Sequence, residues 1–183
     1  MLSELIHAWH DVYVLVGTAS ATLVGLMFVA ATIGAQVFTE SNRAGMRAFL
    51  SPTVVHFSAV LFICILAAIP SQTWQTLAAL LAACSLAGIA YSARVWMQLF
   101  VRRRFDVDVI DRVFYALIPV FGYLLILVDV FLLLKESAVG LDLLAAALIT
   151  LLLAGIRNAW DMTTWIVIRT PVVEDAGRRP ERG

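Results

Sequence analysis

Apolar residues in this chain form five long blocks that are separated by short polar stretches. Each block is about as long as a membrane-spanning helix, because roughly 20 residues at a rise of ~1.5 Å cross a hydrocarbon core of ~30 Å. The pattern therefore predicts an all-α protein, a polytopic transmembrane helical bundle with five spans. These spans are expected at residues 12–38, 52–69, 74–100, 113–134 and 140–168.

Prolines indicate both ends of the second block. Ser51 and Pro52 are residue types favoured at a helix N-cap and at the first helical position, so they predict where the second span begins. Pro70 ends it, and the short connection before Trp74 predicts that the second and third spans form an antiparallel hairpin. Residues 42–50 place apolar and basic side chains on different faces, which favours a short interfacial helix.

The spans make one domain, residues 1–170, and the polar residues 171–183 form a cytoplasmic tail that is expected to be disordered. If the spans alternate in direction, twelve arginines fall on or near one side and Lys135 alone falls on the other. Basic residues concentrate on the cytoplasmic side of membrane proteins. The arginines therefore predict an external N-terminus and a cytoplasmic C-terminus.

Composition narrows the function. The chain is 62% hydrophobic and 14% charged with a net charge of +0, so a nucleic-acid partner is not expected. It contains no fingerprint of a nucleotide-binding loop, a zinc protease or a serine hydrolase, and we expect no enzyme, no cofactor and no metal site. Four side chains near the N-terminus are of metal-binding types, but we interpret them as the solvated face of an interfacial helix: Glu4, His7, His10 and Asp11.

The segment GIRNAWD, residues 155–161, brings polar side chains to the inner end of the last span. Arg157 could extend to the lipid headgroups from this depth and pair locally with Asp161. The alternative is an inner polar cluster between helices, since an arginine four residues before its acid is the less favourable order. Its members would be Arg94, Asp111, Arg112, Arg157, Asn158 and Asp161, with Arg157 opposite Asp111 and with Asp161 opposite Arg94 or Arg112.

Three further residues are candidates for an ion or proton path. His56 lies inside the second span and titrates near neutral pH, so either it has a functional role or it is a neutral imidazole bonded to a neighbouring helix near Ser85. Asp129 lies near the outer end of the fourth span, where it could form the mouth of a path, lie at the interface or pair with Lys135. Tyr115 lies near the inner end of the same span, and a proline and a glycine between the two would permit a kink.

Gly17, Ala21 and Gly25 form a stripe of small residues on the first span. Such stripes let helix backbones approach closely in lipid, so this one could contact another helix of the same chain or a second copy. Cys64 and Cys84 lie at depths too different for a disulfide, and we interpret them as packing thiols.

The segments GTASATLVGLMFVAA, FLSPTVVHF and GIRNAWD together resemble a group of small bacterial multi-pass membrane proteins of no established function. The resemblance extends over most of the chain. It implies a location in the bacterial inner membrane and adds nothing to the site residues.

Two functions follow as expectations. Ionisable residues inside spans favour a channel for ions or protons, and it is expected to be homo-oligomeric because five helices are too few for an evident pore in one chain. The alternative is a non-conducting regulatory or scaffold partner of another membrane complex, which the plain bundle and the basic inner face favour. Partners in either case are the lipid bilayer and membrane proteins.

Overall fold

The computed structural model of the chain describes residues 2–35, 43–70, 73–97 and 113–169. Within these ranges the elements are α1 (Leu2–Ala35), α2 (Arg43–Ala68), α3 (Trp74–Trp96), the π-helical turn η2 (Val113–Leu117), α5 (Ile118–Leu134) and α6 (Val139–Arg169). In this described part, 5 helical segments are long and apolar enough to cross a membrane, which confirms the predicted all-helical fold and number of spans. Which end faces the cytoplasm stays a prediction.

The helical segments that could cross a membrane match the hydropathy blocks closely. They cover Ala8–Ile33, Ser51–Ala68, Trp74–Trp96, Val113–Leu134 and Val139–Thr164. The ends of the first and third predicted spans, residues 36–38 and 98–100, lie outside the described residues, as does the tail from residue 171. Thr73 caps the third span by accepting a hydrogen bond from the Thr76 amide at 3.2 Å, which explains the start predicted there.

The start of the second helix differs from the prediction. α2 begins at Arg43 and continues through Pro52, so Ser51 and Pro52 lie inside the helix and not at its beginning. A proline removes one backbone donor, but membrane helices tolerate this loss when the freed carbonyl finds another partner. The residues from 43 to 50, predicted as a separate interfacial helix, therefore form the first two turns of α2.

The fourth span begins with a turn that sequence reasoning did not predict in this form. Residues 113–117 are wound as a π-helix directly before Pro119. In a π turn the carbonyl of Phe114 would accept from the amide of residue 119, which proline lacks. The Asn158 side-chain amide of α6 donates to this carbonyl at 3.3 Å instead. The proline expected to kink this span thus coincides with a wider turn that a neighbouring helix supports.

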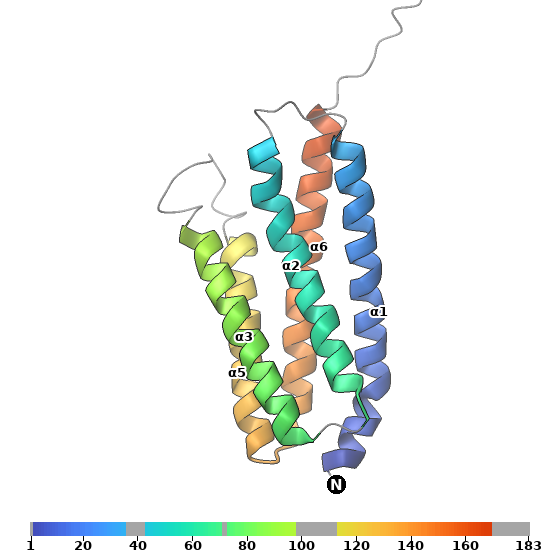
Figure 1. The fold of residues 1–183 in the computed structure, drawn as a ribbon, viewed down its shortest axis with the longest axis vertical. Coiled ribbons are helices and arrows are strands. Elements are labelled where there is room, and N and C mark those ends of the chain that lie inside the picture. The colour runs from blue at the N-terminus through green and yellow to red at the C-terminus, as the bar shows by residue number, and fades with distance from the viewer. Residues whose placement is uncertain (1, 36–42, 71–72, 98–112, 170–183) are drawn as a thin grey trace, which may run out of the picture.

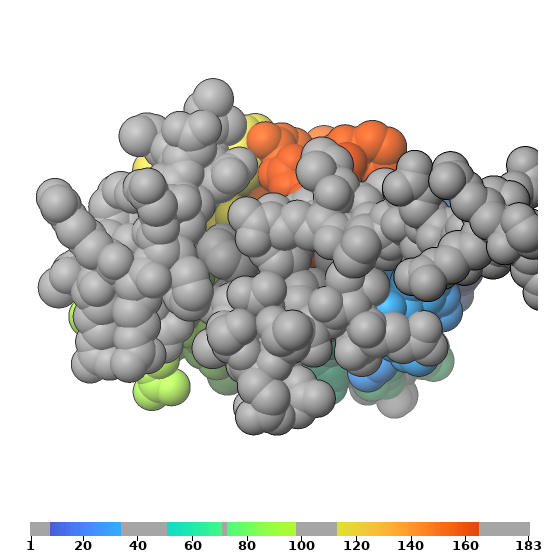
Figure 2. All heavy atoms as spheres, turned by 90° about the horizontal axis from the view of Figure 1, so that it is seen from above, coloured from blue at the N-terminus to red at the C-terminus, as the bar shows by residue number. Residues whose placement is uncertain are grey.

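The helices run side by side along one axis (Figure 1). α1 packs chiefly against α2, and α3 packs chiefly against α5. α6 contacts α1, α2 and α5 and so joins these two pairs. Seen along the axis, α1 and the α3–η2 side lie on opposite flanks of the bundle (Figure 2). α2 and α3 are antiparallel as predicted, but α3 has its main contact with α5 and not with α2.

Three glycines allow close contact between helices in this arrangement. A Cβ atom on Gly88 of α3 would overlap the Tyr123 ring, and one on Gly155 of α6 would overlap the Phe57 ring. A Cβ atom on Gly17 of α1 would lie 3.0 Å from the Cβ atom of Cys64. Small residues therefore position the buried aromatic side chains of the neighbouring helices.

Candidate functional site

Polar side chains that are fully buried lie inside the bundle of this single chain. They are Ser20, Thr53, His56, Ser85, Ser92, Asp129 and Asn158, each with 0% relative exposure. In a dry interior a polar group without a hydrogen-bond partner is costly, so such groups are either paired or functional. They occur at three depths, which we call the outer, middle and inner levels.

The middle level is built around His56 of α2. Its Nδ1 atom lies 3.0 Å from the Tyr123 hydroxyl of α5, and its ring meets the Tyr91 ring edge-on at a centroid distance of 6.2 Å. The Ser85 hydroxyl of α3 donates to the Tyr123 backbone carbonyl. His56 is thus bonded to a neighbouring helix, as one of the two interpretations predicted. Its partner is the Tyr123 hydroxyl, whereas Ser85 bonds the Tyr123 backbone carbonyl and not His56.

The second ring nitrogen of His56 sets this residue apart. Its Nε2 atom is buried and has no hydrogen-bond partner among the described residues. An imidazole bonded through one nitrogen only keeps a second position for a proton donor or acceptor. His56 therefore uses Nδ1 in a hydrogen bond and leaves Nε2 available for a second one.

Asp129 forms the outer level. Both of its carboxylate oxygens are buried without a hydrogen-bond partner in the described part of the chain. A Cβ atom on Gly140 would lie 2.8 Å from Oδ1, so the carboxylate lies against the first turn of α6, where the positive end of the helix dipole favours negative charge. Tyr13 of α1 reaches the same turn, where its hydroxyl donates to the Leu141 carbonyl at 3.5 Å.

Lys135 is not positioned to neutralise this carboxylate. Its ammonium lies over the Phe131 ring at 4.6 Å from the centroid, and Lys135 is exposed at the end of the bundle. The interpretation that Asp129 pairs with Lys135 is therefore wrong, and its position relative to the membrane interface stays a prediction. Asp129 has the turn of α6 beside it and is shielded from solvent.

The inner level joins η2 to α6. The Tyr115 hydroxyl donates to the Asn158 carbonyl at 3.1 Å, while the Asn158 side-chain amide donates to the Phe114 carbonyl at 3.3 Å. This reciprocal pair is the hydrogen-bonded contact between the fourth and fifth spans. Ser92 of α3 is also buried at this end of the bundle, and its Oγ atom lacks a partner within the described residues.

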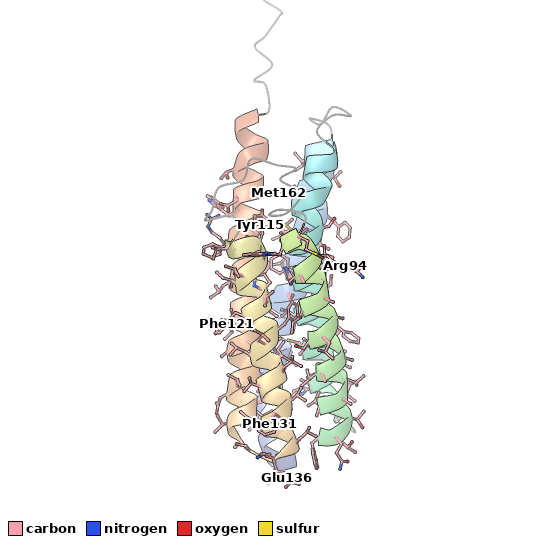
Figure 3. All side chains as sticks on the ribbon, turned by 90° about the vertical axis from the view of Figure 1, so that its left-hand side faces the viewer. Arg94, Tyr115, Phe121, Phe131, Glu136 and Met162 are labelled. Carbon is pink, nitrogen blue, oxygen red and sulfur yellow. The ribbon has the colours of Figure 1, made fainter. Side chains whose placement is uncertain are left out.

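The charges of GIRNAWD take the local arrangement. Arg157 and Asp161 form an ion pair with each other within α6, and the Arg157 guanidinium lies 5.2 Å from the Phe114 ring centroid. The local pair that the first interpretation predicted is thus present, and Asn158 makes a hydrogen-bonded contact between helices. Arg94 lies at a depth similar to that of Tyr115 but points away from the bundle (Figure 3).

Two members of the predicted inner polar cluster, Asp111 and Arg112, lie outside the described residues, so the pairing of Arg157 with Asp111 stays a prediction. Among the residues whose side chains are described, no group of three or more metal-binding side chains occurs. Cys64 and Cys84 are both free thiols, in agreement with their interpretation as packing residues.

The small-residue stripe on α1 divides between two environments. Gly17 is buried against α2, whereas Ala21 is exposed and Gly25 has open space around the position of a Cβ atom. Thr18 and Thr22 donate to carbonyls of their own helix at 2.8 and 2.9 Å and not across a helix contact. The stripe is therefore intramolecular only at its Gly17 end.

Sequence reasoning missed the hydrogen bond that joins α1 to α2. Ser20 donates to the Phe57 carbonyl at 2.7 Å. Ser20 follows Tyr13 and Gly17 at helical spacing, so one buried face through these three residues could have been read from the sequence. Tyr123 was also missed, because a tyrosine inside an apolar span gives no sign of which helix its hydroxyl faces.

No family model, no curated protein and no solved structure matches the chain. The resemblance to small bacterial inner-membrane proteins therefore stays a prediction. The buried polar side chains are the remaining indication of function.

Proposed function

We propose that this protein moves protons across a bacterial inner membrane through the interior of its own helix bundle. The observation that carries the proposal is His56, which is fully buried in a span, bonded to Tyr123 through one ring nitrogen and without a partner at the other among the described residues. Imidazole can accept a proton at one nitrogen and release one from the other. Ionisable side chains that face the inside of a membrane bundle are typical of proton relays.

Burial favours a path within each chain over a pore between chains. His56 and Asp129 have no exposed surface, so neither residue faces a neighbouring copy of the bundle. A hydrated metal ion needs an open pore, whereas a proton can pass along hydrogen-bonded groups and single water molecules. The proposal therefore concerns protons and needs neither an oligomer nor a cofactor.

The three levels provide the steps of such a path. Asp129 with Tyr13 lies at the outer level, Tyr123 with His56 at the middle level, and Tyr115 with Asn158 at the inner level. Asp129 and Tyr123 are six residues apart on α5, which corresponds to about 9 Å along the helix axis.

An apolar layer separates the outer level from the middle level. Its side chains are fully buried: Val60, Ile63, Ile126 and Leu148. Protons cannot cross such a layer without a water molecule or a movement of the helices, so the layer would act as a gate. We therefore expect conduction to be slow or regulated.

The test is proton flux into liposomes that contain the purified protein, driven by a potassium diffusion potential and followed with a trapped pH-sensitive dye. His56→Phe should reduce the flux by about 10²-fold, the contribution typical of a positioned proton-transfer group. Tyr123→Phe and Asp129→Asn should also reduce it. His10→Phe is the matched control, because His10 is exposed on α1. Flux in wild-type protein no greater than in empty liposomes would refute the proposal.

A second candidate is a non-conducting partner of another membrane protein, and the exposed face of α1 favours it. Only 22% of the apolar stretch of α1 that could span a membrane is buried inside the bundle. The corresponding share is 50% for α2 and for α6. Gly25 lies on this face, and nothing is found within 4 Å of the position that a Cβ atom would take there. If the wild type shows no flux while Gly25→Leu releases a co-purified membrane protein, this second function replaces the first.

A further inference from the structure

Three buried polar atoms on three different helices have no hydrogen-bond partner within the described residues. They are Nε2 of His56 on α2, Oγ of Ser92 on α3 and Oδ1 of Asn158 on α6. The side chain of each residue is fully buried. A buried polar atom that stays unpaired costs roughly 1–3 kcal/mol, so three together require a physical explanation.

The fold brings these three helices to one place at the turn η2, which contacts α2, α3 and α6. Asn158 is tied to η2 by the bond from its side-chain amide to the Phe114 carbonyl, and its Oδ1 atom belongs to that same amide group. His56 is one residue before Phe57, whose ring lies against Gly155, one turn from Asn158 on α6. The part of α2 that carries His56 therefore lies beside the part of α6 that leads to Asn158.

Ser92 belongs to the same depth through α3. Ser85, Gly88 and Ser92 are buried along one face of α3, and the first two of them contact Tyr123. Ser92 continues this face by one turn towards η2. The residue before it, Tyr91, has its ring in edge contact with the His56 ring. The ring contact thus brings this part of α3, next to Ser92, against the part of α2 that carries His56.

We infer that His56, Ser92 and Asn158 form a binding site for water in the inner half of the bundle. A buried water molecule typically makes about three hydrogen bonds to groups that would otherwise be unsatisfied. The three atoms can supply both donors and acceptors: a serine hydroxyl does both, an amide oxygen accepts, and an imidazole nitrogen does either according to its tautomer. The site completes the hydrogen bonding of all three residues.

The role of this water rests on the proposed proton path and deepens it. Tyr123 occupies one nitrogen of His56, and the water would occupy the other. A proton that arrives on one nitrogen can then leave from the opposite one towards Asn158 and Tyr115. The water would connect the middle level to the inner level, which the described protein groups alone leave unconnected.

The test is magnetisation transfer from water protons to the ring nitrogens of His56, measured by solid-state NMR on protein in lipid bilayers. Labelling of histidine with ¹⁵N in a His7→Gln, His10→Gln background leaves His56 as the only labelled ring, since the chain has 3 histidines. We expect transfer to Nε2 in this background. Ser92→Ala should weaken it and Asn158→Leu should abolish it.

Thr163→Ala is the control, because it removes an exposed hydroxyl from the helix that carries Asn158, where Thr163 donates only to the Ala159 carbonyl of that helix among the bonds described. It should leave the transfer unchanged. Asn158→Leu also removes the bond to Phe114, so Ser92→Ala decides the test if that variant does not fold.

A His56 signal without transfer from water would overturn the inference, and so would equal transfer in Ser92→Ala and in the parent. These results are distinct from those of the flux test. A wet site in a protein without proton flux overturns the proposed function and leaves the water site standing. A dry site in a protein that conducts overturns the water site alone.

Discussion

Gly88→Ala is expected to destabilise the bundle at the middle level. A Cβ atom at this position overlaps the Tyr123 ring, and Tyr123 has 0% relative exposure, so its ring cannot move without displacing neighbouring side chains or entering solvent-free space inside the bundle. Overpacking of this kind typically costs about 1–3 kcal/mol. At ~2–4 °C per kcal/mol for a chain of this size, the midpoint of thermal unfolding should lie roughly 2–12 °C below that of a glycine-to-alanine variant without the overlap, because the gain in helix propensity is common to both.

Gly25→Ala provides the matched control for this prediction. Both substitutions add one methyl group to a glycine inside a helix, but nothing lies within 4 Å of the methyl position at Gly25. Alanine is favoured over glycine in helices by about 0.8–1.0 kcal/mol, so this variant should unfold at the same temperature as the parent or higher. Thermal unfolding of both proteins in detergent, followed by circular dichroism, measures the difference.

Gly88→Ala should also change the surroundings of His56. Displacement of Tyr123 should lengthen the hydrogen bond to His56 and shift the ¹⁵N resonance of His56 Nδ1. If Gly88→Ala and Gly25→Ala have equal unfolding midpoints and the His56 resonance does not move, the close contact between α3 and Tyr123 is refuted.

Three other experiments test separate features of the fold. Glu136→Gly should raise the free energy of unfolding by about 0.5–1 kcal/mol, because Glu136 has a φ of 55° and relief of left-handed strain exceeds the entropic cost of glycine; a lower free energy in chemical unfolding would contradict this. A double-mutant cycle of Arg157→Gln and Asp161→Asn should give a coupling below about 1 kcal/mol, since both side chains are partly exposed at 34% and 28%; a coupling of several kcal/mol would contradict this partial exposure of the pair. Cysteines placed at Ser137 and Ala44 in a background without the native thiols should react from opposite sides of the membrane, and labelling from one side would refute the topology.

Hydropathy alone was sufficient to predict the spans, because the bilayer imposes one length on every crossing helix. It was not sufficient to predict where helices continue beyond the membrane. α2 extends back from Pro52 to Arg43, and α1 begins at Leu2. Neither extension is governed by apolar length, and a proline near the start of a span is compatible both with a helix start and with a helix interior.

The sequence was sufficient to identify most residues of the candidate site, but it was not sufficient to identify which of them contact each other. His56, Asp129, Tyr115 and Asn158 were identified because a polar side chain inside a span stands out. The partner of His56 was not identified, because sequence gives the depth of a residue in its own helix but not the neighbour that each helix face meets. The pairing of α3 with α5, which brings Tyr123 to His56, is a property of the packed bundle.

The π turn at the start of the fourth span determines helical phase. Tyr115 and Tyr123 are eight residues apart, so an α-helix with ~100° per residue would place them about 80° out of phase. The π turn η2 has more residues per turn than an α-helix, so it reduces the angle between Tyr115 and Tyr123. Both hydroxyls face the interior, that of Tyr115 towards Asn158 and that of Tyr123 towards His56. Rewinding of η2 as α-helix would rotate Tyr115 out of this alignment without moving Tyr123. The bond from Asn158 to the Phe114 carbonyl therefore fixes a rotational setting of the fourth span from outside that span.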